Sequence, residues 1–486
     1  MATDKPTSSF GIELEFLVAV KRNPPSPARK PLRFLGARGA PIVVDGGGNA
    51  HGVSVPAAVR ANIKRTIRLA AERCAGDRVV SSEAEATADP EAIHLRPYAE
   101  GWQVKDDMSV KMPPELLREE HMQEYIWQRA EITSPPLWAT EKSYNEVRAV
   151  VWALSDAYWV LAPAETAGLH VHYGRGRDWI PFHELRRIAA FLYPADPILV
   201  QMHPPPRRET AFAASNRLYS QLAHWVTPEQ AAALIRNPDL EEVPPWADGS
   251  GPQTRPLPAP APFFPPLFRR GALGGYTFSE HVFGLGRDPM LDQGRQTPLG
   301  TEAGARALLA APNAPTVALL MQFFMNRAAY NFGAYNSGTY RRVWPGPSGP
   351  GGELLPDPYN QPRRTLEFRQ AASTDDADEV VAHCRVVVRI CEWAGRSRPR
   401  DFWKIVLDCA QAETHPGWYD VFDLLADLGL ADEARVLQRR LARSYGVQTP
   451  DRGRAPGWRR ASSVPPTRTW TSLPSRVLRS FRYMVV

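Results

Sequence analysis

The sequence predicts an α+β protein in which an antiparallel sheet has helices packed on one of its faces. Three segments, residues 10–20, 168–174 and 365–370, alternate polar and apolar residues in the manner of strands. Between and after these segments, apolar residues recur at the spacing of amphipathic helices. Strands separated by long, mostly helical stretches are typical of a sheet covered by helices.

Apolar stripes predict the helices in order along the chain. The stripes occupy residues 59–74, 147–161, 185–192 and 380–391. The last stripe follows Asp375 and Asp376, and acidic residues favour a helix start because they complement the dipole there. Residues 417–446 are predicted to form two further short helices that divide at Gly429.

Composition predicts a soluble protein of a reducing compartment. The chain has no run of about 18 uncharged apolar residues, and its first ten residues lack the pattern of a secretory signal. Four cysteines are too few to staple 486 residues. Cys384 and Cys391 lie in one helical stripe and are predicted to be small apolar core residues rather than a thiol site. We therefore expect a cytoplasmic protein without a membrane segment.

The formal net charge of +6 is concentrated near the C-terminus. Residues 451–486 hold eight arginines and one aspartate, so they carry +7 and the preceding 450 residues sum to −1. The nearly neutral body gives little electrostatic support for nucleic-acid binding. We expect residues 447–486 to form a basic, disordered tail, for which contact with phosphates or an anionic surface is the alternative.

Residues 1–446 are expected to form one domain with a proline-rich insertion near residues 242–268. Nine of the 23 residues from Pro244 to Pro266 are proline, which excludes a helix or a central strand. A stiff surface loop is the simpler interpretation, and a PxxP-type ligand is the alternative. Residues 344–362 are rich in glycine and proline and are predicted to form a mobile flap beside the third strand.

Each predicted strand carries two chemically active side chains on one face. The pairs are Glu13 with Glu15, His170 with His172, and Glu367 with Arg369. Each pair alone is also compatible with a solvent-facing strand or an ordinary ion pair. Because the neighbouring residues are apolar, however, we expect buried strands, in which a carboxylate is costly unless it is paired or binds a cation. If the strands are neighbours about 4.8 Å apart, the six groups converge within roughly 10–15 Å.

Such a cluster is suited to a divalent cation and a phosphate. Glutamates with one neutral imidazole match Mg²⁺ or Mn²⁺, and the planar fork of Arg369 can hold the oxygens of a phosphoryl group during transfer. Glu131 precedes Pro135 and Pro136, which must end a strand, so it is a fourth candidate ligand or a capping carboxylate. The sequence contains no GxxxxGK[ST] loop, which excludes a P-loop nucleotide site.

The segments FGIELEF, EITSPPL, GLHVHYG and TLEFRQ, in this order, resemble the amidoligase family, a branch of the glutamine synthetase and glutamate–cysteine ligase fold. The resemblance implies a glutamine synthetase-like catalytic fold that carries ATP and two or three divalent cations on the concave face of an antiparallel sheet. It also implies an ATP-dependent ligase that joins a carboxylate to an amine through an acyl phosphate. The implied substrates are small molecules or peptides.

The resemblance further implies roles for individual residues. The metal ligands would be Glu13, Glu15, Glu131, Glu367 and one histidine, preferably His170. Arg369 would contact the transferred phosphate, and His172 would orient a ligand or substrate group; with Glu131, these are the expected catalytic residues. Arg369, Arg217 and Asn331 are the expected cofactor ligands, the last two from segments similar to substrate-side motifs. Asp106 and Asp107 lie in a segment that resembles an acidic amine site.

Two other classes of function stay open at this point. Two histidines and a carboxylate also bind Zn²⁺ or Fe²⁺, so the first alternative is a metal-dependent hydrolase or a mononuclear iron oxygenase. The second is a non-catalytic protein that docks through its insertion and tail. A ligase predicts amine-dependent release of ADP and phosphate, a hydrolase or oxygenase predicts turnover without ATP, and a docking protein predicts that Glu367→Ala leaves function intact.

Overall fold

The computed structural model describes nine stretches of the chain. These are residues 6–23, 29–45, 54–89, 92–208, 211–236, 298–322, 328–336, 364–415 and 418–444. The proline-rich insertion near residues 242–268, the flap at residues 344–362 and the basic tail at residues 447–486 lie outside the described residues. The expected division of the chain into domain, insertion and tail therefore stays a prediction.

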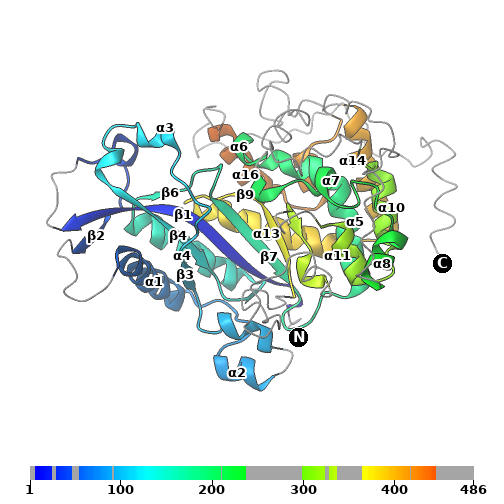
Figure 1. Ribbon diagram of the computed structural model, residues 1–486, viewed down its shortest axis with the longest axis horizontal. Helices are drawn as coiled ribbons and strands as arrows, with labels where there is room; N and C mark the ends of the chain where they lie inside the picture. Colours follow the sequence, from blue (N-terminus) through cyan, green and yellow to red (C-terminus); the bar gives the residue numbers. More distant parts are fainter. Residues whose placement is uncertain are drawn as a thin grey trace, which may run out of the picture. The chain divides into compact units, whose positions relative to one another are not determined.

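One sheet of nine strands organises the described residues (Figure 1). Its main order is β3 (Gln103–Lys105), β4 (Ile126–Thr133), β1 (Ser9–Asn23), β7 (Gly168–Gly174), β9 (Leu366–Ala372) and β8 (Tyr330–Asn331). Neighbours along this order run antiparallel. The short strands β2 (Ile42–Asp45), β5 (Leu137–Trp138) and β6 (Val160–Leu161) also pair with β1. Only β2 runs parallel to its partner among these pairings, so the antiparallel sheet that we predicted has one exception.

The three predicted strands are β1, β7 and β9, which are consecutive in the sheet. Their register places the polar residues of neighbouring strands opposite one another. Cross-strand partners are Glu13 and His170, Glu15 and Glu131, and His172 and Glu367. Because partners in register project from the same side of a sheet, these side chains share one face.

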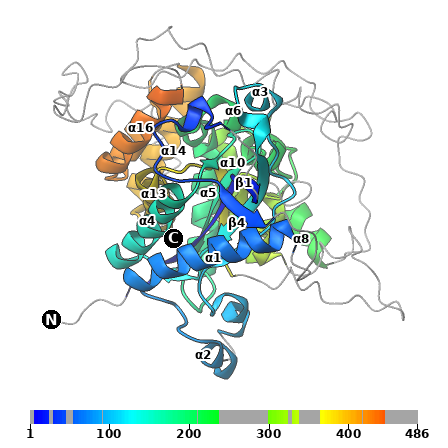
Figure 2. The ribbon, with the colours of Figure 1, turned by 90° about the vertical axis from the view of Figure 1, so that its left-hand side faces the viewer.

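Three long helices pack on the other face of the sheet (Figure 2). They are α1 (Val55–Arg73), α4 (Glu141–Ala157) and α13 (Ala377–Arg396). α1 contacts β2, β3 and β4, α13 contacts β1 and β7, and α4 packs against both helices. The alternate residues of β1 supply the core: Phe10 and Ile12 are no more than 2% exposed, and Phe10 stacks on Tyr144 of α4. The predicted α+β class is confirmed.

The described residues contain more α-helices than the sequence predicted. Besides α1, α4 and α13, they are α2 (Glu83–Ala88), α3 (Pro114–Leu117), α5 (Phe182–Leu199), α6 (Pro205–Arg208), α7 (Asn216–Tyr219), α8 (Pro228–Arg236), α10 (Thr301–Ala310), α11 (Ala314–Leu320), α14 (Pro399–Thr414), α15 (Val421–Asp427) and α16 (Ala431–Ser444). α5, α10 and α14 pack together, and α5 also contacts α13. Within the described stretches, none of these helices has the length and apolar character needed to cross a bilayer.

Local signals in the sequence are confirmed at several helix ends. The side chain of Asp376 caps α13 by accepting hydrogen bonds from the backbone N–H groups of Asp378 and Glu379. Gly429 separates α15 from α16 with φ of 76°, a backbone conformation that favours glycine. Cys384 and Cys391 are fully buried in α13, as expected of core residues. The stripe at 147–161 was too long, because α4 ends at Ala157 and Leu161 lies in β6.

Candidate active site

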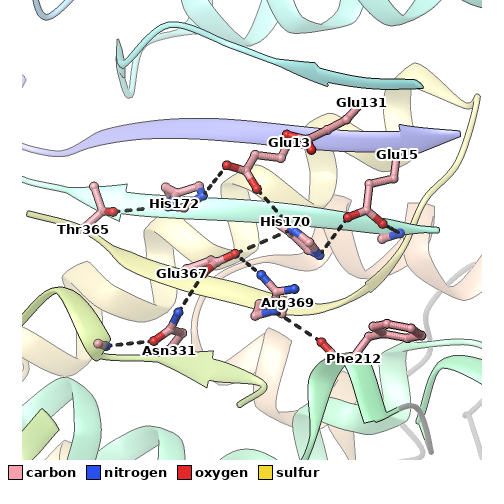
Figure 3. Close-up of polar contacts among 12 residues, drawn as sticks. Glu13, Glu15, Glu131, His170, His172, Phe212, Asn331, Thr365, Glu367 and Arg369 are labelled. Carbon is pink, nitrogen blue, oxygen red and sulfur yellow. Dashed lines mark hydrogen bonds and ion pairs between the residues drawn. The ribbon is translucent and has the colours of Figure 1, made fainter. Parts of the chain in front are cut away.

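Six polar side chains of β1, β7 and β9 converge on one face of the sheet (Figure 3). They are Glu13, Glu15, His170, His172, Glu367 and Arg369. Glu13, Glu15 and both histidines are no more than 9% exposed. The structure thus brings together all three pairs that the sequence singled out, whereas their chemical roles stay predictions.

Glu13 joins the two histidines at the centre of the cluster. Its Oε2 lies 3.3 Å from Nδ1 of His170, and its Oε1 lies 3.3 Å from Nε2 of His172. The hydroxyl of Thr365 lies 3.2 Å from Nδ1 of His172 and so occupies the other nitrogen of that ring. On its far side, Nε2 of His170 lies 3.7 Å from Oε1 of Glu15. One carboxylate therefore lies between the two imidazoles and hydrogen-bonds to His170.

Glu367 is held by a cation, an amide and an imidazole. Nη1 of Arg369 donates to Oε1 of Glu367, and Nδ2 of Asn331 donates to Oε2 at 2.9 Å. Nδ1 of His170 lies 3.6 Å from Oε1 of Glu367. Burial raises the pKa of Glu367, but the charges of Arg369 and of the two histidines outweigh burial and hold the pKa at about 2. Asn331 thus lies at the cluster, where the sequence predicted a ligand-binding residue.

The end of the cluster at Glu15 and Glu131 has an excess of carboxylates. Desolvation by burial and the charge of Asp107 raise the pKa of Glu15 to about 8, although its Oε2 accepts a hydrogen bond of 2.6 Å from the backbone N–H of Gly168. Desolvation and the charge of Glu13 likewise raise the pKa of Glu131, whose Oε1 lies 3.8 Å from Nζ of Lys105. A bound cation would offset the cost of ionising both groups.

The donor atoms fit a divalent cation. One ligand atom each of Glu13, His172 and Glu367 lies within 4.8 Å of the other two, close to the roughly 4.2 Å that separates opposite oxygen ligands of Mg²⁺. The sequence favoured His170 over His172 as the histidine ligand. The structure makes His172 an equal candidate, because it groups with two carboxylates while His170 contacts Glu13, Glu15 and Glu367.

Arg217, which we expected to be a cofactor ligand, does not join this cluster through any described contact, and its expected role stays a prediction. Its Nη2 donates to Oε1 of Glu413 at 3.1 Å, and its guanidinium lies 5.1 Å from the ring centroid of Tyr193. The backbone N–H of Arg217 donates to Oδ2 of Asp196 at 3.0 Å, which anchors the start of α7 to α5. The side chain is therefore directed into the helical layer of α5 and α14.

Arg207 is a buried cation to which the sequence assigned no role. It is 1% exposed; its Nη2 donates to the backbone carbonyl of Arg369 at 2.9 Å, and its Nε and Nη1 have no hydrogen-bond partner among the described residues. A Cβ at Gly168 would lie 2.5 Å from Nη2, so glycine leaves the room for this guanidinium. The charge of Arg207 lowers the pKa of Glu15, while burial lowers the pKa of Arg207 to about 10. The signal in the sequence was that Arg207 lies in the same segment as Arg217, which is similar to a substrate-side motif of the amidoligase family.

We predict that Arg207→Met weakens Mg²⁺ binding by about tenfold at pH 7 and that the deficit shrinks at pH 9. Loss of the guanidinium raises the pKa of Glu15 further, so more of this carboxyl is protonated at neutral pH. Isothermal titration calorimetry at both pH values measures the difference. Arg207→Lys retains the charge and serves as the control. A deficit of equal size at both pH values would show that Arg207 acts by packing alone.

We also predict that the metal-free protein loses stability between pH 6.5 and 8. Once the unfolded chain has ionised Glu15 near pH 4.5, the folded protein retains that proton until about pH 8, so stability falls as pH rises through this window. The pKa of His170, lowered by burial to about 4 from 6.5, has the opposite effect only below pH 6.5. Between pH 6.5 and 8 the free energy of unfolding is therefore expected to fall by about 2 kcal/mol. Urea denaturation in EDTA at a series of pH values measures this fall. If the same fall with pH persists in Glu15→Gln, Glu15 is not its cause.

Comparison with known proteins agrees with the strand motifs. Residues 6–232 match a family model described as "Putative amidoligase enzyme". No curated protein and no solved structure matches the chain. The matched region contains β1, β4 and β7, whereas β9 with Glu367 and Arg369 lies beyond it and completes the same face of the sheet. Residues 6–232, just under half of the chain, are therefore similar to the amidoligase family.

Proposed function

We propose that the protein is an ATP-dependent carboxylate–amine ligase that forms an amide or peptide bond through an acyl phosphate. The observation that carries this proposal is the position of Arg369, whose Nη1 contacts Glu367 within a group of carboxylates and imidazoles suited to a divalent cation. The family match supports amide formation. A sheet with its polar residues on one face and helices on the other accords with a glutamine synthetase-like fold.

The first step brings two anions, a carboxylate and the γ-phosphate of ATP, into contact. Mg²⁺ or Mn²⁺, when bound, would supply positive charge that neutralises the phosphate oxygens. Glu13, Glu367 and either histidine are the residues that would hold it, with Glu15 and Glu131 as ligands for a second ion. Nε of Arg369 donates to the carbonyl of Phe212 at 3.3 Å, which holds the guanidinium beside Glu367, from where it can stabilise the transferring phosphoryl group.

The second step requires an amine that has lost a proton. Burial raises the pKa values of Glu131 and Glu15 in the metal-free protein. Whichever of the two does not hold an ion would keep a raised pKa and be a stronger base near neutral pH than an ordinary carboxylate. Both lie near Asp107, since its charge raises the pKa of each. The carboxylate-rich end of the cluster is therefore the place where we expect proton transfer from the amine, and phosphate leaves as the amide forms.

A nucleotide assay tests the proposal. The purified full chain is incubated with Mg²⁺, ATP and pooled amino acids, amines and small peptides, and ADP release is followed. We expect release that depends on both a carboxylate and an amine and that is lost in Arg369→Ala. Turnover of a substrate without ATP would favour the hydrolase or oxygenase alternative, and absence of ATP binding would refute the ligase. The expected cytoplasmic location is a separate prediction, testable by cell fractionation.

A further inference from the structure

A pocket adjoins the cluster at the N-terminal half of β1. One side of the pocket is formed by residues 9–13 and by the ends of the neighbouring strands, including Ser134, His172 and Thr365. The other side is formed by His94, Leu95 and Tyr98 of the 3-10 helix η2 (Ile93–Tyr98). Glu13 and His172 line this pocket and also belong to the proposed cation site, so the two sites share a wall.

The pocket and the opposite end of the cluster differ in charge. Among the described residues, no lysine or arginine lines the pocket, whose apolar lining includes Leu95, Tyr98 and Pro136. The cations lie at the cluster and at its Glu15 end. They are Arg369 beside Glu367, Arg207 over Gly168 and Lys105 beside Glu131. An anionic substrate therefore finds its counter-charges away from the pocket, and an uncharged aromatic group with a few hydrogen-bonding atoms is the better occupant.

We propose that this pocket binds the nucleoside of the nucleoside triphosphate, so that the phosphates extend from Gly11 past Glu13 towards Arg369. This proposal rests on the proposed ligase function and adds the orientation of the bound nucleotide along β1. Gly11, Glu13 and Glu15 face the same side of β1 at intervals of about 7 Å. The nucleoside then lies at the Gly11 end, the cation at Glu13, and the carboxylate and amine at the Glu15 end beside Arg207.

Gly11 provides a direct way to fill the pocket. Among the described residues, a Cβ added there would have only Oγ of Ser134 within 4 Å, at 3.5 Å, which is an ordinary van der Waals contact. A larger side chain therefore enters the pocket without displacing backbone, and valine suits a strand. Gly300, before α10, has no atom of the described residues within 4 Å of an added Cβ, and Gly300→Val is the matched control.

The experiment compares two probes in the presence of Mg²⁺: ATP and inorganic tripolyphosphate, which has the phosphates without the nucleoside. Isothermal titration calorimetry measures the Kd of each probe for the unaltered full chain, Gly11→Ala, Gly11→Val and Gly300→Val. We expect Gly11→Val to raise the Kd of ATP by at least about tenfold, with a smaller rise for Gly11→Ala. The Kd of tripolyphosphate stays unchanged in all variants, and Gly300→Val binds both probes normally.

Two results would overturn the assignment. An unchanged Kd of ATP in Gly11→Val places the nucleoside elsewhere, and equal losses for ATP and tripolyphosphate show that residue 11 disturbs the cation site instead. Failure of the unaltered protein to bind ATP would instead refute the ligase proposal itself, so the two failures are distinguishable. If thermal unfolding shows that Gly11→Val is misfolded, Gly11→Ala provides the same comparison with a smaller added volume.

Discussion

Glu13→Gln is expected to abolish measurable Mg²⁺ binding and to reduce ATP-dependent ADP release by about a thousandfold. Each oxygen of Glu13 lies 3.3 Å from a different imidazole, so this carboxylate both supplies a ligand and joins His170 to His172. Glutamine retains the shape of the side chain but removes the charge and turns an N–H₂ group towards the cation. Isothermal titration with Mg²⁺ and a steady-state ADP assay measure the two effects.

The same substitution is expected to raise the stability of the metal-free protein, because it removes one of several buried carboxylates that repel one another. The charge of Glu13 contributes to the raised pKa of Glu131.

Glu146→Gln is the matched control: Glu146 is fully buried away from the cluster and accepts hydrogen bonds from Arg78 at 2.7 Å and Trp102 at 2.6 Å. Loss of that charge should cost about 2 kcal/mol without lowering the specific activity of the folded protein. Undiminished Mg²⁺ affinity in Glu13→Gln would contradict the proposed cation site.

Arg369→Ala is expected to lower kcat by about a thousandfold while the affinity for Mg²⁺ changes little. The guanidinium is held beside Glu367 and next to the carbonyl of Phe212, a position suited to a phosphoryl group during transfer. Arg369→Lys is expected to recover only part of the rate, because an ammonium is a point charge without the planar fork. Single-turnover ADP release separates this effect from substrate binding.

Arg217→Lys provides the contrast for Arg369. Its guanidinium contacts Glu413 and Tyr193, so we expect a loss of thermal stability with kcat retained. If Arg217→Lys lowered kcat as much as Arg369→Ala does, Arg217 would take part in the reaction, which contradicts a purely structural role. The two arginines therefore distinguish a residue at the cluster from one that supports the fold.

The pairs on the three strands were predictable because their signal is local. In residues 10–20, an alternation of period two places Glu13 and Glu15 on one side of the strand, whatever that strand pairs with. The same alternation places His170 and His172 on one side of their strand. The helix start at Asp376 is also a local signal, because its side chain bonds to backbone groups two and three residues further along the chain. Local periodicity failed at Leu161, where an apolar residue in phase with α4 belongs to β6.

The amino-acid sequence by itself determined the strand motifs, much of the helices α1, α4, α5 and α13, and the residue types of the proposed cation and phosphate site. Only the tertiary structure decided that β1, β7 and β9 are consecutive, that Arg207 rather than Arg217 lies beside Glu15, and that η2 closes a pocket next to Glu13. These outcomes depend on packing between segments distant in the chain. A short sequence pattern reports which side of its own strand or helix a residue occupies, but not what that side faces.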